Sequence, residues 1–263
     1  MRRIIGLIPA VVLVAPMFVA AAAPAAASAC SSVTTSKGTM TAGIVDQNVD
    51  SSTVVPTGCD IGVYLDGNDG GNWSVSGATI AGAIYYGVFV DGINGNVSAD
   101  VTDSTISDIG DNPFSGNQHG VAVYYDGYQT TGTVSGTVSG TVSGNTISLY
   151  QKGGIVVSGT NADVTVSDNS VTGLGQVLII AQNGIQFGYG ASGSATGNAI
   201  SGNYYTGSGY ASAGLLLFDV AANAVMTSDN HYSGNQRNLT LVTTQACPSM
   251  YGGVYGGWGI CIP

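Results

Sequence analysis

The stretch VSGNTISLYQKGGIVVSG, residues 142–159, contains the pattern that decides the fold. Two short segments within it, GNTIS and GIVV, alternate apolar with small polar residues. A period of two is typical of short β-strands with one buried face. Lys152 is the only charged residue of the stretch. Because both segments recur along the chain, the fold has to be explained by the repeat.

The first recurring motif is a glycine followed by an apolar residue, any residue and a second apolar residue. It returns every 25 to 34 residues, beginning at Gly62, Gly87, Gly120, Gly154, Gly184 and Gly214. The alternation predicts inward-pointing pairs at Val63/Leu65, Val88/Val90, Val121/Val123, Ile155/Val157, Ile185/Phe187 and Leu215/Leu217. It predicts an outward row at Tyr64, Phe89, Ala122, Val156, Gln186 and Leu216.

The second motif begins with Gly or Asp and ends with an Ile-like and a Ser-like residue. Four of its copies carry an asparagine at the second position, namely Asn145, Asn169, Asn198 and Asn230. Asparagine tolerates the left-handed backbone of a tight turn. Its amide can also bond to the same amide one repeat away. We therefore predict a structural ladder of these four side chains.

A unit of this length cannot bury its own apolar face, whereas stacking it on a copy buries that face. The sequence predicts an all-β, right-handed parallel β-helix of about six to seven coils, with coils about 4.8 Å apart. We expect an N-terminal cap at residues 30–60, repeats at 61–235 and a disulfide-stapled C-terminal cap at 236–263. The low-complexity stretch at 132–144 leaves its own register ambiguous.

On these two motifs, residues 61–233 resemble the right-handed parallel β-helix family that includes pectate lyases, polygalacturonases and alginate epimerases. The resemblance implies a fold and transfers no complete active site. Of the Gly-His-Gly motif of polygalacturonase-like members, only His119 and Gly120 match. The coils lack the arginine that pectate lyases use near calcium. The chain also has no glutamate for the Asp-Pro-His-Glu motif of alginate epimerases.

The first 29 residues are typical of a signal peptide. Arg2 and Arg3 precede an apolar segment, and small residues at Ala27 and Ala29 predict cleavage near Ala29. We expect a secreted or cell-envelope protein with no transmembrane segment after cleavage. The alternatives are an uncleaved membrane anchor and a lipidated Cys30. In an oxidising compartment the four cysteines predict two disulfides, Cys30 with Cys59 and Cys247 with Cys261, each stapling its own terminus.

The charge excludes several classes of partner. The chain carries 15 aspartates, and beyond the predicted signal peptide its only cations are Lys37, Lys152 and Arg237. Nucleic acid and anionic membranes need clustered Lys and Arg, so neither is expected as a partner. We expect no cofactor. Calcium on the aspartates that follow the strands (Asp66, Asp91, Asp126 and Asp219) is an alternative to plain turn chemistry.

Candidate catalytic residues come from the segments that lead into the Gly-led strands. Insertions at one point of a repeat gather on one face, which is often the binding face. Asp108 and Asp111 offer the paired carboxylates of glycoside hydrolysis. His119 and Lys152 offer an acid or base for hydrolysis or β-elimination of a polysaccharide. The alternative is that SDIGD and DNP are ordinary turns.

Aromatic residues are the remaining candidates for a binding role. An exposed row of rings could stack on sugars, because such side chains combine an apolar body with a polar tip. The candidate substrate-binding residues are Tyr64, Phe89, Tyr150, Tyr204 and Tyr205. In the alternative, long loops or terminal segments fold over the row.

These features support three hypotheses for the function. The first is a non-catalytic extracellular or cell-envelope protein that presents a flat aromatic and polar face to a neutral glycan or, in the alternative, to a protein partner. The second is a polysaccharide lyase or glycoside hydrolase acting at Asp108, Asp111 and His119. The third is a purely structural surface protein. The incomplete family motifs favour the first.

Overall fold

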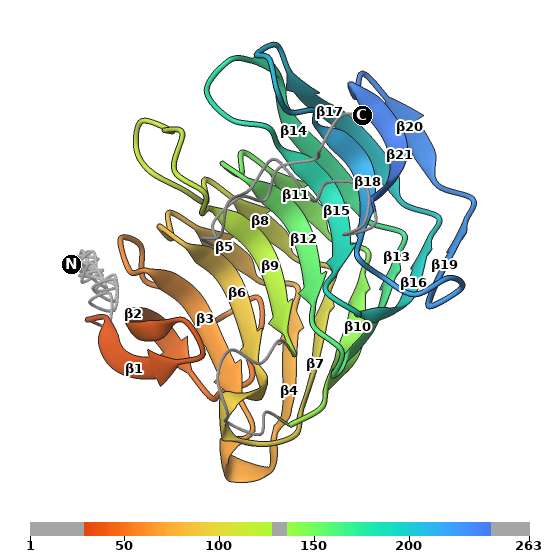
Figure 1. The fold of residues 1–263 in the computed structure, drawn as a ribbon. Coiled ribbons are helices and arrows are strands. Elements are labelled where there is room, and N and C mark those ends of the chain that lie inside the picture. Colours follow the sequence, from red (N-terminus) through yellow and green to blue (C-terminus); the bar gives the residue numbers. More distant parts are fainter. Residues whose placement is uncertain (1–28, 128–135, 243–263) are drawn as a thin grey trace, which may run out of the picture.

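The computed structural model describes residues 29–127 and 136–242, and this part of the chain is all β apart from two 3₁₀ turns, η1 (Asn68–Gly70) and η2 (Gly92–Asn94) (Figure 1). Its strands form one nine-stranded and two six-stranded sheets. In spatial order the first sheet contains β1 (Ser31–Thr35), β2 (Gly38–Val45), β3 (Ile61–Asp66), β6 (Tyr86–Asp91), β9 (Val121–Asp126), β12 (Gly153–Ser158), β15 (Asn183–Gly188), β18 (Ala213–Phe218) and β21 (Arg237–Val242).

The two smaller sheets are built from the strands in between. The second sheet contains β4 (Asn72–Ser76), β7 (Val97–Thr102), β10 (Val138–Ser143), β13 (Ala162–Ser167), β16 (Ser192–Thr196) and β19 (Val225–Ser228). The third contains β5 (Thr79–Ala81), β8 (Thr105–Ser107), β11 (Thr146–Ser148), β14 (Ser170–Val177), β17 (Ala199–Tyr205) and β20 (His231–Ser233). From β3 onward, successive strands enter the three sheets in rotation, and all of these pairings are parallel. This order is compatible with a parallel β-helix.

The inward columns of the first sheet form the centre of the core. Val63, Val88, Val123, Ile155, Ile185 and Leu215 are paired in register and completely buried. Burying one such aliphatic side chain contributes about 1.5 to 3 kcal/mol. The column therefore links every turn of the chain to the next.

One predicted copy of the Gly-led motif is out of register. Ala122, and not Gly120, lies in the column of Gly62, Gly87 and Gly154, so the inward residues of β9 are Val123 and Tyr125. The predicted inward residue Val121 belongs instead to the hydrophobic cluster on the outer face of the sheet, together with Phe89. The outward residue that pairs with Phe89 is Tyr124. The prediction was wrong because alanine replaces the glycine that served as its marker.

The glycine column is tight because it faces the third sheet. A Cβ added at Gly184 would lie 2.5 Å from Cγ2 of Ile200 and 2.7 Å from the carbonyl oxygen of Gly214. Gly62 and Gly154 face the same kind of neighbours, an aliphatic side chain of the third sheet and a carbonyl of the next strand. The motif therefore needs glycine for space at the corner between the sheets.

The four predicted asparagines lie in file at the turn before the third sheet. The Asn145 amide donates to Asn169 Oδ1, Asn169 to Asn198 and Asn198 to Asn230, each at 2.9 Å. Ser104 continues the file, since its backbone N–H donates to Asn145 Oδ1 at 2.9 Å. The left-handed residue is the one before each asparagine, for example Gly144 (φ 67°) or Asp168 (φ 56°). The expectation that asparagine itself adopts that conformation was wrong.

The sheets extend beyond the predicted repeat boundaries. Residues 42–45 of β2 pair in parallel with β3, and β21 pairs in parallel with β18, although these segments were assigned to the caps. A disulfide joins Cys30 to Cys59. Cys247, Cys261, residues 243–263 of the predicted C-terminal cap and residues 1–28 of the predicted signal peptide lie outside the described residues. Of the low-complexity stretch, residues 138–143 form β10 in the second sheet.

The β1–β2 hairpin folds back over the outer face of the first sheet. At its tip the Ser36 backbone N–H donates to Asp91 Oδ2 at 2.8 Å, and Lys37 forms an ion pair with Asp126 at 2.8 Å. Tyr64 lies beneath it and donates through its hydroxyl to the Thr34 carbonyl at 3.3 Å. The hairpin therefore covers the first part of the outward column.

Candidate functional site

Three pockets lie around the segments that lead from the third sheet into the first, which project on one side of the molecule (Figure 1). The hairpin pocket, of about 580 Å³, is lined by Lys37, Thr39, Met40, Asp60, Tyr85, Tyr86, Asn117, Gln118 and His119. The loop pocket, of about 600 Å³, is lined by Thr57, Gly58, Gly82, Ile84, Asp108, Gly110, Asp111, Asn112 and Phe114. The lysine pocket, of about 210 Å³, is lined by Gln118, Lys152, Ile179, Ile180, Ala181, Tyr205 and Tyr210.

The loop at residues 108–120, which separates the first two pockets, is held from below by Gln151. This side chain is completely buried. Its Oε1 accepts hydrogen bonds from the backbone N–H groups of Asp111 (3.1 Å) and Ser115 (2.9 Å), and its Nε2 donates to the Asn117 carbonyl at 2.9 Å. Glycine is required at position 120 (φ 87°), because a Cβ there would lie 2.6 Å from Cβ of Gln151. The loop is therefore fixed by a buried amide.

His119 and Asp111 meet across this loop. The distance from His119 Nε2 to Asp111 Oδ1 is 2.8 Å. The second carboxylate oxygen of Asp111 accepts hydrogen bonds from Ser115 and Asn117. These hydrogen bonds, first that from Ser115 and then those from His119 and Asn117, lower the pKa of Asp111 to about 2. The ionised carboxylate only accepts, so a neutral His119 carries its proton on Nε2 and leaves Nδ1 as an acceptor.

Aromatic rings lead from the covered face of the sheet into the hairpin pocket. The Tyr86 ring stacks on Tyr124 with centroids 5.2 Å apart, and Tyr85 lies 4.3 Å from the His119 ring. Tyr85, Tyr86 and His119 are all partly exposed. Burial raises the pKa of Tyr86 further above its usual value, so its hydroxyl remains protonated. The pocket therefore offers three ring systems with polar tips.

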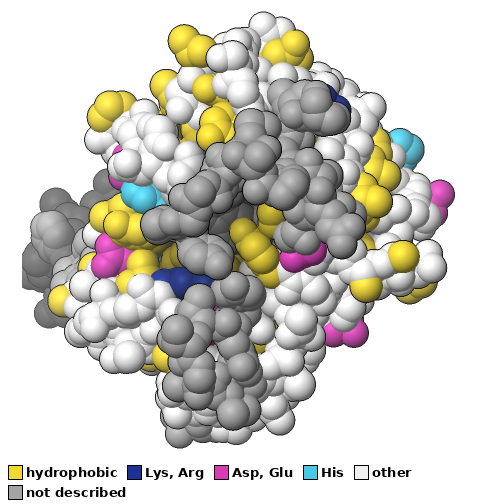
Figure 2. Space-filling model, viewed as in Figure 1, with side chains coloured by type: hydrophobic (Ala, Val, Ile, Leu, Met, Phe, Trp, Pro, Cys, Tyr) yellow, Lys and Arg dark blue, Asp and Glu magenta, His cyan; other side chains and the backbone are white. Residues whose placement is uncertain are grey.

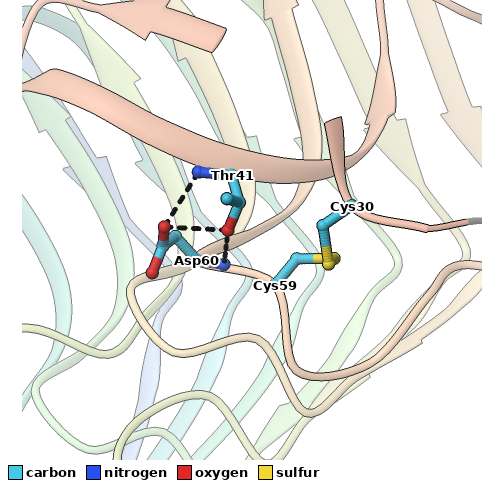
Figure 3. Close-up of a disulfide and its surroundings, with 4 residues drawn as sticks. All are labelled: Cys30, Thr41, Cys59 and Asp60. Carbon is cyan, nitrogen blue, oxygen red and sulfur yellow. Dashed lines mark hydrogen bonds between the residues drawn. A yellow bond between two sulfur atoms is a disulfide. The ribbon is translucent and has the colours of Figure 1, made fainter. Parts of the chain in front are cut away.

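Asp60 supplies a carboxylate to the same pocket, directly after the disulfide (Figure 3). Its Oδ2 accepts hydrogen bonds from the backbone N–H and the hydroxyl of Thr41, both at 2.8 Å. In Figure 3 the second oxygen is directed away from Thr41. No described residue donates a hydrogen bond to that oxygen. Asp60 therefore combines a fixed position with an available acceptor.

The prediction of an exposed aromatic row was wrong for Tyr64, Phe89 and Tyr150, which are buried. Tyr64 and Phe89 are 1% and 0% exposed and form an edge-on pair with centroids 5.8 Å apart. Tyr150 is buried in the core, and its hydroxyl donates to Asn203 Oδ1 at 2.6 Å. The alternative, in which a terminal segment folds over the row, describes Tyr64 and Phe89 correctly, because the hairpin covers them. Tyr204 and Tyr205 are partly exposed, and Tyr205 lines the lysine pocket.

Lys152 is separate from His119 and is almost completely buried, with 3% of its surface exposed. Its Nζ donates a hydrogen bond to the Ala181 carbonyl at 2.8 Å. Burial lowers the pKa of Lys152 to about 7, because desolvation disfavours the ammonium form. The side chain lines the lysine pocket, while the two predicted carboxylates line the loop pocket.

Three of the four aspartates that follow the strands are buried and hydrogen-bonded, and Asp219 is partly exposed. Asp66, Asp91 and Asp126 lie in register on β3, β6 and β9 and are at most 2% exposed. Asp66 accepts from the Asn94 amide at 2.6 Å, and Asp91 and Asp126 bind the hairpin tip. Burial is the main cause that raises the pKa of Asp91, to about 6. In the described ranges, no group of three or more His, Cys, Asp or Glu side chains is placed to hold a metal ion.

The structure thus brings together only part of the predicted catalytic set. Asp111 and His119 are in contact, Asp108 shares the loop pocket with Asp111, and Lys152 lies elsewhere. Asp60, Tyr85 and Tyr86 were missed because they lie outside both motifs. The adjacent tyrosines just before Gly87 were the one available signal, since an insertion face collects the residues that precede each Gly-led strand.

No protein-family model matches the chain, and no curated protein or solved structure matches it significantly. Within the described residues no helix is both long enough and apolar enough to cross a membrane. Figure 2 shows one face of the molecule, on which a few acidic side chains are scattered among hydrophobic side chains and the surface formed by the backbone and other side chains.

Proposed function

We propose that this protein is a secreted or cell-envelope-associated, right-handed parallel β-helix that binds a neutral glycan without cleaving it. The rotation of strands through three parallel sheets supports the β-helix. The crossover between parallel strands is right-handed in almost all proteins, which supports the hand. The Cys30–Cys59 disulfide is typical of proteins outside the cytosol.

The binding site in this proposal is the hairpin pocket, and the observation that carries it is the convergence there of Tyr85, Tyr86, His119 and Asp60. Pockets for small ligands typically combine aromatic walls with a few fixed polar groups. The tyrosine rings provide apolar faces for the C–H side of a sugar, and their hydroxyls can bond to its hydroxyl groups. The available oxygen of Asp60 can accept from a further sugar hydroxyl.

Charge favours a neutral ligand over an acidic one. The chain has a formal net charge of −10. Among the described residues, Lys37 is the one cation that lines the hairpin pocket, and it is paired with Asp126. A uronic acid polymer would therefore approach an acidic surface with no cluster of cations to neutralise it. A neutral hexose chain meets no such repulsion.

The Asp111–His119 contact favours a second candidate, an acid–base enzyme acting on a polysaccharide. An oriented histidine with one available ring nitrogen can act as a general base. The low pKa of Asp111 argues against its use as the general acid of a glycosidase, which needs a raised value. No second charged group that could complete a mechanism is in contact with His119 in the described structure. We therefore place binding first.

The test is incubation of the purified protein with a panel of neutral and acidic polysaccharides, with and without calcium. Both retention and new reducing or unsaturated ends are measured. We expect retention on a neutral polymer without products, and at least a tenfold loss of affinity in Tyr85→Ala. Tyr204→Ala is the matched control, because this partly exposed tyrosine does not line the hairpin pocket.

Two outcomes would count against the proposal. Product formation that disappears in His119→Ala would establish the second candidate instead. Equal retention in Tyr85→Ala and in the unmodified protein would remove the hairpin pocket from any binding role. If retention required calcium, the result would support the alternative in which aspartates bind a calcium ion at the site.

A further inference from the structure

The tip of the β1–β2 hairpin places an amine against a buried carboxyl group. Lys37 Nζ lies 2.8 Å from Asp126 Oδ2, and the Asp126 side chain has no exposed surface, whereas that of Lys37 is 30% exposed. The Ser36 hydroxyl donates to the same Asp126 oxygen at 2.7 Å. Lys37 Nζ also lies over the Tyr124 ring, 5.6 Å from its centroid. Two segments that are far apart in the sequence therefore hold an amine and a carboxyl group together at the edge of the solvent.

A second carboxyl group lies beside the first. Asp91 pairs in register with Asp126 on the neighbouring strand and is completely buried. Ser36 joins the two, because its backbone N–H donates to Asp91 Oδ2 at 2.8 Å while its hydroxyl donates to Asp126. Burial is the main cause that raises the pKa of Asp91, to about 6. Asp91 can therefore both take up and release a proton near neutral pH.

Two tyrosine hydroxyls complete the surroundings of these carboxyl groups. Tyr124 Oη donates to Asp126 Oδ1 at 3.4 Å, and Tyr64 Oη donates to Asp91 Oδ2 at 3.3 Å. Burial raises the pKa of Tyr124 well above its usual value, so its hydroxyl remains a donor. A donor at Oδ1 stabilises the negative charge that develops on this oxygen when a nucleophile attacks the carboxyl carbon.

We propose that the side chains of Lys37 and Asp126 condense to an amide, which fastens the hairpin tip covalently to the end of β9. Well-oriented groups within one molecule react with effective molarities of about 10⁵ to 10⁸ M. The burial of Asp126 keeps water away from its carboxyl carbon and so disfavours hydrolysis of the product. The hairpin, which begins next to the Cys30–Cys59 disulfide, then has a covalent attachment at its base and at its tip.

The condensation needs no oxidant or other co-reactant. A proton passes from the Lys37 ammonium group to Asp126 Oδ2, which leaves a neutral amine and a carboxylic acid. The Nζ lone pair attacks Cγ and forms the C–N bond, while the carbonyl π electrons move to Oδ1. Asp91 carries a second proton from the nitrogen to Oδ2, the C–Oδ2 bond breaks, and Oδ2 leaves as water while the carbonyl forms again at Oδ1. Of the three ammonium protons, one stays on the amide and two leave in the water molecule.

Mass spectrometry of the purified, reduced protein tests the proposal directly. We expect the intact mass to be lower by one water molecule than the mass calculated from the sequence and the measured N-terminus. Trypsin cleaves after a lysine only when its side chain is unmodified, so the denatured protein should be cut after Lys152 and not after Lys37. The full calculated mass, together with cleavage after Lys37, would overturn the proposal without the need for any variant to fold.

Two variants separate condensation from the ion pair alone. Lys37→Arg keeps the positive charge but has no primary amine, so its mass should show no loss of water. Asp126→Asn keeps the carbonyl carbon but changes the leaving group, so condensation in this variant should release ammonia instead of water. Loss of water in either variant would place the condensation at other residues and would overturn the assignment.

The role of Asp91 has its own test. Asp91→Asn should slow the condensation, and Asp91→Glu, which returns a carboxyl group, should restore it at least in part. An unchanged rate in Asp91→Asn would exclude Asp91 as the proton carrier. Retention on the polysaccharide panel is an independent readout, so glycan binding can fail while the cross-link is found, and the reverse.

Discussion

Asn169 shows how a single side chain joins neighbouring strands of the fold. It donates to Asn198 Oδ1 and to the Val142 carbonyl, and its own Oδ1 accepts from Asn145. All three contacts are buried. Leaving buried polar groups without partners costs about 1 to 3 kcal/mol each.

Replacement of Asn169 should therefore lower the stability of the protein substantially. We expect Asn169→Ala to lower the free energy of unfolding by about 2 to 4 kcal/mol, since several buried groups lose partners together. Urea denaturation followed by circular dichroism measures the change. Asn72→Ala, at an exposed position of β4, is the control and should stay within about 0.5 kcal/mol. Similar losses in both variants would mean that the row of asparagine hydrogen bonds makes no particular contribution to the free energy of unfolding.

Asp91 gives the stability a pH dependence with a definite sign. Its pKa is about 6 in the folded protein, above the ordinary aspartate value, so the folded state binds the proton more tightly. The stabilisation from this group is complete below about pH 4 and is lost as the pH rises through 6. Relative to Asp91→Asn, the unmodified protein should lose roughly 1 kcal/mol of stability between pH 5 and pH 8.

Urea titrations at the two pH values provide this comparison. Asp163→Asn, at an exposed position of β13, controls for the general effect of removing one negative charge. A pH slope for the unmodified protein that matches the slope of Asp91→Asn would contradict the assignment.

At the residue scale, prediction succeeded where a side chain belongs to a column. The asparagine file was visible because the same residue type returns at the same position of the repeat. Gln151 was missed because the loop that it holds occurs only once, so no periodic signal marks it. The contact between His119 and Asp111 was expected only as a cluster, because sequence spacing does not fix the path of an irregular loop.

The glycine column is the feature that belongs to the scale of the strand. Ala122 is the natural exception in the column that contains Gly62 and Gly87, and it is completely buried. Gly184→Ala should lower stability by about 1 to 3 kcal/mol, because the new methyl group would contact the Gly214 carbonyl. Ala122→Gly should cost at most about 1 kcal/mol. Thermal unfolding of both variants distinguishes a steric requirement from a general preference, and equal effects would exclude the steric explanation.

The β1–β2 hairpin forms one wall of the proposed glycan site and is tied down by the disulfide. The bond closes a loop between positions 29 residues apart. In the chain-entropy model such a loop is worth about 3 to 4 kcal/mol. We expect the double variant Cys30→Ser/Cys59→Ser to lose about that much stability and to bind glycan more weakly, which calorimetry can measure in one sample series.

At the scale of single elements, most strands were predictable, and the errors have physical causes. The alternation placed six Gly-led strands, five of them in the correct register. The sixth failed because Ala122 takes the place of the glycine that marks this column in the other strands. The outward aromatic column was identified except for Tyr124, but its burial was not, because the hairpin that covers it carries no repeat signal. Whether an outward face is exposed depends on tertiary contacts from outside the repeat.

The whole molecule depends on successive turns of chain lying on one another in register. The outward residues that begin the strands of the third sheet pair in register and form one column, namely Thr79, Thr105, Thr146, Ser170, Ala199 and His231. Neighbouring strands of a sheet lie about 4.8 Å apart. Distances along the column should therefore grow in equal steps with the number of intervening strands.

The most direct test measures these distances by pulsed electron paramagnetic resonance between pairs of spin labels. One label is fixed at Thr79, and the other is placed in turn at Ser170, Ala199 and His231. The account predicts mean separations that rise by about 4.8 Å for each further strand, to roughly 24 Å at His231. Separations that do not increase in this order, or a separation at His231 that is shorter than the one at Ser170, would contradict parallel stacking of the strands.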